Sequence, residues 1–296
     1  MSRKRNWKQY NRQLVQSGSI TFYCNPKLFN AKKIKTKGRP IEYSDQLICM
    51  LMMLKIRFRL PYRALEGFAD SLLKLQKCRR KIPNYTSICK RAAKLKGSLP
   101  SLKSAGKHVV VALDATGVKV YGEGEWKVKI HGKGRDRKWM KLHIAIDADS
   151  QEIISEVTTE SHLTDGKMTQ ALLDQIEGEI KEVLADGAYD GKECREAISR
   201  RGGKALIPPP AHARLWGLDP DRDDAIRVIR GLGGDKQARS LWGKLTGYSR
   251  RSLVETAFSR MKCLFGDRLF SKTIERQGVE NGLRCILLNK MKRIEG

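Results

Sequence analysis

The chain has 296 residues, of which 40% are hydrophobic, and it carries a formal net charge of +27. This length suits one large domain or two smaller ones, and the longest apolar run, 47–54, is too short for a membrane-spanning helix. Seven cysteines without a CxxC pair favour free thiols in a reducing cytoplasm over disulfides or a zinc site.

The positive charge is concentrated in the first third of the chain. Residues 1–107 hold 26 of the 59 Lys and Arg residues but only 4 of the 32 Asp and Glu residues, which gives this part a net charge of +22. No apolar segment follows the basic start, so no secretory signal is expected. A basic module ahead of a nearly balanced remainder indicates binding to nucleic acid. The alternative is a well-solvated basic surface.

Short helices are predicted within this basic part. After a basic flexible arm at 1–40, helical patterns cover 43–59, 60–75 and 82–95. Asn84 or Thr86 is suited to cap the third helix. We interpret 41–97 as a helix-turn-helix-like DNA-binding domain, followed by a linker at 98–107. Many helical hairpins share this pattern, so an ordinary helical bundle is the alternative.

The pattern changes to alternating strands and helices after the linker. Strands are predicted at 108–120, 139–149, 152–160, 182–190 and 204–210, with helices at 165–176 and 191–201. Three strands followed by helix, strand, helix and strand predict an α/β fold with a mixed sheet, of the ribonuclease-H-like type, over 108–296. Residues 229–237 lack the Lys-Ser/Thr ending of a phosphate-binding loop and are interpreted as a flexible insertion.

Two aspartates stand where predicted strands end. Asp114 follows the apolar run 109–113, and Asp186 follows a second apolar strand just before Gly187. Ligand sites collect at strand ends of an open α/β sheet, although a single Asp there can simply open a turn. Two such residues on neighbouring strands favour a site.

Other aspartates in these segments have more ordinary interpretations. Asp147 and Asp149 fall in a predicted hairpin turn and are interpreted as turn formers. Asp190 is either a helix cap or a reserve ligand.

A third carboxylate is predicted on a helix that begins near Ser249 and ends before Gly266. At about 100° per residue, one stripe of this helix carries Tyr248, Arg251, Glu255 and Lys262. The alternative is a solvated face with an ordinary i,i+4 ion pair between Arg251 and Glu255. Together with the two strand-end aspartates, Glu255 would complete an all-oxygen site for divalent cations, whose charge would cancel the repulsion among the carboxylates.

These motifs resemble those of the DDE transposases of bacterial insertion sequences. More narrowly, the chain looks like the insertion-sequence-five family, in the subgroup marked by the string VYGEGEWKV, which begins at Val120. The family signature Y-x2-R-x3-E-x6-K is matched by Tyr248, Arg251, Glu255 and Lys262. The motifs D-G-A/G-Y and D-x-T are matched by 186–189 and by Asp114 with Thr116.

The resemblance implies a metal-dependent DNA transposase with a ribonuclease-H-like catalytic domain. Such an enzyme binds the terminal inverted repeats of its element, cleaves a phosphodiester to leave a 3′-OH, and joins that end to target DNA. The implied ligands of two Mg²⁺ ions, which Mn²⁺ could replace, are Asp114, Asp186 and Glu255.

The resemblance also implies contacts with double-stranded DNA. Arg251 and Lys262 would bind phosphates, and Tyr248 and Trp126 would stack on a base, although Trp126 could instead pack on the sheet. A homodimer or higher oligomer, associated with the bacterial nucleoid in the cytoplasm, is expected. Two other functions stay open: a catalytically silent DNA-binding repressor descended from a transposase, and a structure-specific nuclease on the same fold.

Overall fold

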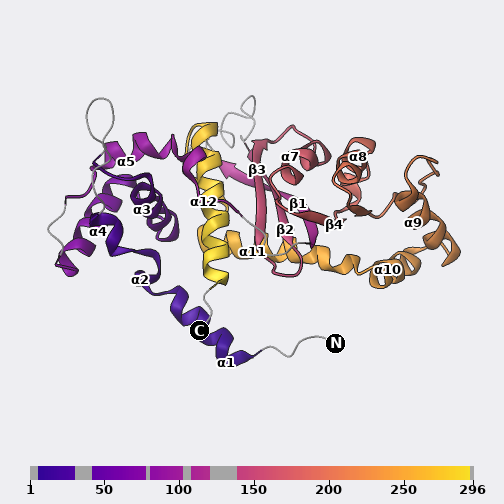
Figure 1. Cartoon of the computed structure of the whole chain (residues 1–296), viewed down its shortest axis with the longest axis horizontal. Coiled ribbons are helices and arrows are strands. Elements are labelled where there is room, and N and C mark those ends of the chain that lie inside the picture. The colour runs from indigo at the N-terminus through magenta and orange to yellow at the C-terminus, as the bar shows by residue number, and fades with distance from the viewer. Residues whose placement is uncertain (1–5, 31–41, 78–80, 103–107, 121–138, 294–296) are drawn as a thin grey trace, which may run out of the picture. The chain divides into compact units, whose positions relative to one another are not determined.

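The computed structural model of the protein describes residues 6–30, 42–77, 81–102, 108–120 and 139–293 (Figure 1). Its contacts divide the chain into two compact units: residues 1–101 together with 263–296, and residues 102–262. The division differs from the predicted domain at 108–296, because the last 34 residues group with the N-terminal helices. No helix among the described residues is long and apolar enough to cross a membrane.

The first unit is helical, and its central helices lie where the sequence predicts them. The prediction of a flexible arm at 1–40 is wrong for 7–30, where three helical elements form. Asn84 caps α5: its Oδ1 accepts a hydrogen bond of 2.8 Å from the backbone N–H of Ser87. The elements of this unit are α1 (Trp7–Ser17), α2 (Ile20–Tyr23), η1 (Pro26–Asn30), α3 (Asp45–Arg57), α4 (Tyr62–Leu75), α5 (Tyr85–Ala92), η2 (Leu95–Ser98), β6 (Arg268–Leu269) and α12 (Ile274–Lys292).

Helix α3 explains why the C-terminal residues join this unit. All of its residues from Leu47 to Ile56 are buried, so the helix needs neighbours on every side. Helices α4, α5 and α12 all contact α3. In α12, side chains such as Leu283 and Leu287 are fully buried. The apolar run predicts that α3 lies inside a core, whereas its C-terminal partner is visible only in the folded chain.

The second unit contains a mixed sheet with strand order β3-β2-β1-β4-β5. Strands β1, β2 and β3 are antiparallel to one another, while β4 is parallel to β1 and β5 is parallel to β4. This is the ribonuclease-H-like arrangement, and it confirms the predicted fold class. The strands are β1 (His108–Val120), β2 (Trp139–Asp147), β3 (Ile153–Glu160), β4 (Glu179–Leu184) and β5 (Lys204–Leu206).

Helices and short 3₁₀ turns complete the second unit. They are η3 (Asp165–Met168), α7 (Thr169–Leu173), η4 (Gly187–Tyr189), α8 (Lys192–Arg200), α9 (Pro220–Gly231), α10 (Lys236–Leu245), η5 (Tyr248–Arg251) and α11 (Ser252–Phe265), of which the last three residues are assigned to the first unit.

The prediction of a flexible insertion at 229–237 is wrong, because this segment spans the end of α9 and the start of α10. Asp219 and Asp235 cap these two helices, with carboxylates that accept hydrogen bonds from Arg222 and Ala238 N–H groups. Buried side chains from both helices then pack into one small core, made of Ala225, Ile229, Ala238 and Trp242.

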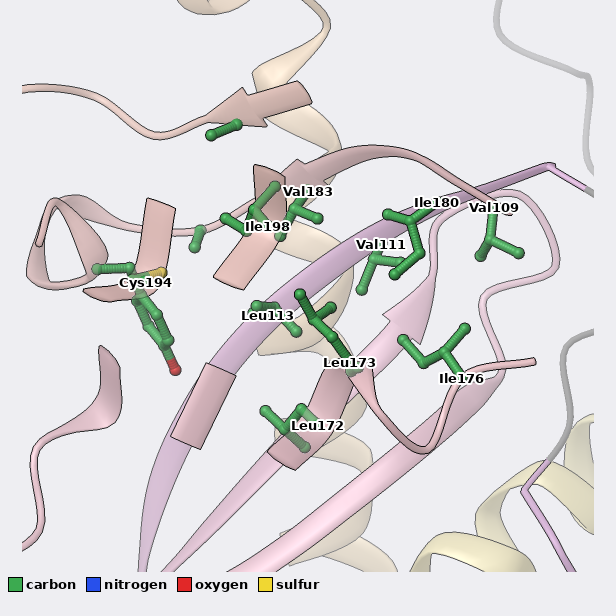
Figure 2. Close-up of a cluster of buried hydrophobic side chains, with 14 of the residues drawn as sticks. Val109, Val111, Leu113, Leu172, Leu173, Ile176, Ile180, Val183, Cys194 and Ile198 are labelled. Carbon is green, nitrogen blue, oxygen red and sulfur yellow. The ribbon is translucent and has the colours of Figure 1, made fainter. Parts of the chain in front are cut away.

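The two faces of β1 have different partners, because successive strand residues point to opposite faces. Val111 and Leu113 belong to a buried cluster that includes Leu172 and Leu173 of α7 and Ile198 of α8, as Figure 2 shows. The even-numbered residues of β1 from Ala112 onward therefore face away from α7 and α8. Asp114 is one of them.

Candidate functional site

Asp114 lies within β1, and Asp186 lies just after the adjacent parallel strand β4. Ala112 of β1 pairs with Leu184, the last residue of β4, and each aspartate lies two residues beyond this pair. The strand predicted at 182–190 ends at Leu184 in the structure, and Asp186 is instead the N-cap of η4. Its Oδ1 accepts a hydrogen bond of 2.9 Å from Ala188 N–H. The prediction of two strand-end aspartates is therefore wrong for Asp114, which lies in the middle of β1 and pairs there with Ile144 of β2.

Arg251 connects Asp114 with Glu255. Its Nη1 donates to Asp114 Oδ2 across 3.3 Å, and its Nη2 forms an ion pair with Glu255 Oε1. The Arg251 side chain is only 19% exposed. The alternative interpretation was a surface ion pair between Arg251 and Glu255 only. The structure adds a second contact of Arg251, with the partly buried carboxylate of Asp114 on β1.

Lys262 lies seven residues after Glu255 in α11 and also contacts β1. Its Nζ donates a hydrogen bond of 2.7 Å to Oγ1 of Thr116. Thr116 lies two residues after Asp114, on the same face of the strand. Four residues of the two matched motifs thus meet in two contacts, Arg251 with Asp114 and Lys262 with Thr116, along the face of β1 that points away from α7 and α8.

Burial and three charged neighbours act on the carboxylate of Asp114. Burial raises the pKa of Asp114 above its usual value, and the charges of Asp186 and Glu255 raise it further. The backbone N–H of Ala115 and the Arg251 guanidinium act in the opposite direction. A carboxylate in this position is costly to ionise, so a cation that shares its charge would be favoured.

Tyr248 lies beside this cluster. Burial raises the pKa of its hydroxyl; Arg251 lowers it, and the nearby charges of Asp186 and Asp114 raise it. Its ring packs against Trp242 of α10, with 5.5 Å between the ring centroids. Of the predicted DNA contacts, Trp126 lies outside the described residues, so its placement stays a prediction.

The donor chemistry of this site fits a divalent metal ion. Asp114, Asp186 and Glu255 would offer only carboxylate oxygens, which Mg²⁺ and Mn²⁺ prefer. Within the described residues, however, no three His, Cys, Asp or Glu side chains are already gathered into a metal-binding group. Arg251 instead contacts two of the three carboxylates. Binding of a metal ion would therefore require these side chains to rearrange.

Asp190 has a role that sequence analysis missed. It does not cap α8, whose N-cap is Gly191. Its carboxylate is no open ligand either, because it is only 2% exposed and forms ion pairs with Arg195 of α8 and Arg222 of α9. No local pattern marks these partners, since α9 was not predicted. The other aspartates behave as predicted turn formers: Asp147 accepts hydrogen bonds from Asp149 N–H and the Ser150 hydroxyl.

The fold and these side chains define a ribonuclease-H-like protein in which residues of β1, η5 and α11 meet on one face of the sheet, with Asp186 in the turn after the adjacent strand β4. Comparison with known families gives the more specific assignment. A family model described as a transposase DDE domain matches residues 105–290, which is more than half of the chain. A second model with the same description matches residues 15–123. The chain therefore belongs to the DDE-domain transposases.

Individual relatives are distant. An uncharacterized protein of Aquifex aeolicus (strain VF5) is 25% identical over 292 residues. The match covers 90% of this chain and 81% of that protein. The piggyBac transposase synaptic complex with hairpin DNA is 10% identical, with a TM-score of 0.42 and coverage of 94% and 73%. The Drosophila P element transposase strand transfer complex is 10% identical, with a TM-score of 0.32 and coverage of 97% and 85%. These scores are low, so the assignment rests on the family models.

Proposed function

We propose that this transposase binds the terminal inverted repeats of an insertion sequence of the insertion-sequence-five type, cleaves the DNA to leave a 3′-OH, and joins that end to target DNA. The observation that carries the proposal is the contact of Arg251 with both Asp114 and Glu255. This contact links the two motifs that are most distant in sequence. Asp186 lies in the turn after the adjacent strand β4, two residues beyond the pair of Ala112 with Leu184.

In the proposed reaction Asp114, Asp186 and Glu255 hold two divalent cations, Mg²⁺ or Mn²⁺. Cations bound there would supply charge neutralisation at the attacking and leaving oxygens of a phosphoryl transfer. Arg251 already serves as the counter-ion of two of these carboxylates, so it keeps the site together without metal.

The basic and aromatic side chains would position the DNA. Arg251 and Lys262 carry charges suited to phosphate oxygens, and the planar Arg251 guanidinium can bind two oxygens at once. Tyr248 is half-buried at the edge of the carboxylate cluster, where its ring could stack on a base of the transposon end. Trp126 is proposed for the same role.

DNA binding is proposed to rest mainly on the N-terminal residues, which carry most of the net positive charge. Neutralising many phosphates displaces counterions, so the affinity for DNA should fall steeply as salt rises. Two ends must be brought together for joining, and we therefore propose that the protein acts as a homodimer or a higher oligomer in the bacterial nucleoid.

The test is a cleavage and joining assay with the full chain, its element's ends, plasmid DNA and Mg²⁺ or Mn²⁺. Alanine at Asp114, Asp186 or Glu255 should each lower both activities by about 1000-fold or more and leave end binding intact. Asp149→Ala is the matched control, because this carboxylate is exposed and pairs with Arg250 outside the cluster.

The outcomes separate the alternative functions. Cleavage without joining would indicate a structure-specific nuclease, and specific end binding without cleavage would indicate a silent repressor. Full activity in EDTA would exclude the metal-dependent reaction. Full activity of any one alanine variant would remove that carboxylate from the site.

A further inference from the structure

We infer that Arg222, in the helical insertion formed by α9 and α10, is a positioning residue that fixes Asp186 through Asp190. The inference rests on the proposed function, in which Asp186 binds a metal ion. Arg222 itself contacts neither Asp114 nor Glu255 in the structure. Its side chain is only 4% exposed, and it reaches the site through a chain of buried contacts.

The first step is the turn that carries Asp186. The carbonyl oxygen of Asp186 accepts a hydrogen bond of 3.1 Å from Tyr189 N–H, and Gly187 O accepts one of 3.1 Å from Asp190 N–H. Asp186 Oδ1 also accepts from Ala188 N–H within the same turn. Asp186 and Asp190 are therefore the two ends of one hydrogen-bonded turn, and a displacement of one end would be transmitted to the other.

The second step is the fixation of Asp190. Its Oδ1 accepts a hydrogen bond of 2.8 Å from Arg195 Nε, and its two oxygens lie 3.2 and 3.1 Å from Arg222 Nε. All three side chains are almost fully buried. A buried carboxylate is strongly disfavoured without its partners, so Asp190 remains where the two arginines hold it.

The third step is the fixation of Arg222 by its own surroundings. Its Nη1 donates to Arg214 O across 2.7 Å, and its guanidinium lies 3.8 Å from the ring centroid of Trp216. Asp219, the N-cap of α9, accepts from Arg222 N–H and also pairs with Arg195. Ion pairs therefore connect the start of α9 with Arg195 of α8 and with Asp190.

The insertion also contacts the other side of the candidate site. Trp242 of α10 packs against Tyr248 in η5, the turn that carries Arg251. Since α9 and α10 share one small core, a single helical hairpin contacts both the segment that follows Asp186 and the segment that precedes Glu255. The insertion is therefore placed to hold the two segments in a fixed relation, and Arg222 is its link to Asp186.

The experiment compares Arg222→Met with Arg227→Met in the full chain. Arg227 is the matched control, because it lies on the same helix but is exposed and pairs only with Asp224 in the structure. Mn²⁺ affinity is measured by titration calorimetry, DNA-end affinity by gel shift, cleavage by strand nicking, and folding by circular dichroism.

Arg222→Met should weaken Mn²⁺ binding about tenfold, in the range found when groups that orient metal ligands are removed. It should slow cleavage and leave DNA-end affinity unchanged, whereas Arg227→Met should change none of these. Electrostatics alone predicts the opposite sign, since removing a positive charge near the site would strengthen Mn²⁺ binding. Weaker binding by a folded variant would therefore support a positioning role.

A folded Arg222→Met protein with wild-type Mn²⁺ affinity would overturn the inference and leave the network a purely structural one. If this variant does not fold, Arg222→Lys, which retains the charge but loses the donors to Arg214 O, is compared in the same way, and unchanged affinity would again overturn it. Failure of the wild-type protein to bind Mn²⁺ or to cleave DNA would instead contradict the proposed function, so the two failures are distinguishable.

Discussion

Nη1 of Arg251 lies 3.3 Å from Oδ2 of Asp114, although 137 residues separate them in the chain. Both side chains are less than one-fifth exposed, whereas Glu255, which shares the same guanidinium, is 54% exposed. The ion pair between Arg251 and Asp114 is therefore largely desolvated, whereas the ion pair between Arg251 and Glu255 is more exposed to solvent. This relationship makes Arg251 the residue whose variants discriminate most sharply between a role in the reaction and a surface ion pair.

Arg251→Lys should lower the rate of strand cleavage by about 100-fold, in the range found when one preorganised donor is removed. Lysine keeps the charge but loses the planar, bidentate geometry, so the melting temperature should change little. The measurements are single-turnover cleavage and thermal unfolding. Arg250→Lys is the control, since Arg250 pairs only with Asp149 in the structure. Wild-type cleavage by Arg251→Lys would show that Arg251 has a structural role only.

Lys262→Ala should reduce cleavage by about tenfold or more if the ammonium group binds a phosphate. Thr116→Val removes only the oxygen that Lys262 contacts in the structure. Because Lys262 is exposed and an exposed hydrogen bond contributes little, Thr116→Val should leave cleavage within about a factor of two. Equal losses from both variants would show that the contact with Thr116, rather than a phosphate, accounts for the effect of Lys262.

A fragment of residues 1–101 should not fold cooperatively by itself. It lacks α12, which packs on α3 and contributes fully buried leucines, so a large apolar surface would be exposed to water. Joining residues 263–296 to this fragment through a flexible linker should restore a cooperative thermal transition, measured by circular dichroism.

The same joined protein provides its own control. Leu283→Asp places a charge at a position that is fully buried, and it should abolish the restored transition. A sharp transition of residues 1–101 alone would contradict the division of the chain into these two units.

His143 should make the protein sensitive to acid. Burial lowers the pKa of its imidazole from 6.5 to about 4, Asp165 partly opposes this shift, and Lys141 adds to it. The folded state therefore holds His143 neutral, whereas the unfolded state protonates it near 6.5. The stabilisation is full above pH 6.5 and is lost as the pH falls toward 4, with a slope of up to about 1.4 kcal/mol per pH unit.

His143→Gln should remove this part of the pH dependence, which is measured as the free energy of unfolding at several values between pH 7 and pH 5. His162→Gln is the control, because His162 is exposed and contacts only Glu160 in the structure. Parallel pH curves for His143→Gln and the wild-type protein would show that His143 does not titrate as its burial requires.

Local sequence determined the elements that carry the candidate site. The apolar run before Asp114 specified β1 because β-branched and aliphatic residues suit a buried strand. The order of strands and helices specified the sheet. Asn84 was one of two candidate caps, because its short side chain can accept a hydrogen bond from a backbone N–H three residues later. The stripe of Tyr248, Arg251 and Glu255 followed from helical periodicity alone. These features depend on neighbours within a few residues, which a sequence displays directly.

Only the tertiary structure decided which distant side chains meet. Arg251 could be assigned to a helix from the sequence, but its contact with Asp114 depends on which face of β1 packs toward α11. Asp190 gave no sign of its partners, because Arg222 lies at the start of α9, a helix that the sequence analysis did not predict. The apolar α3 predicted a core without revealing that α12 covers it. Burial and ion pairing are set by packing among residues far apart in the chain, and that packing has no periodic signature in the sequence.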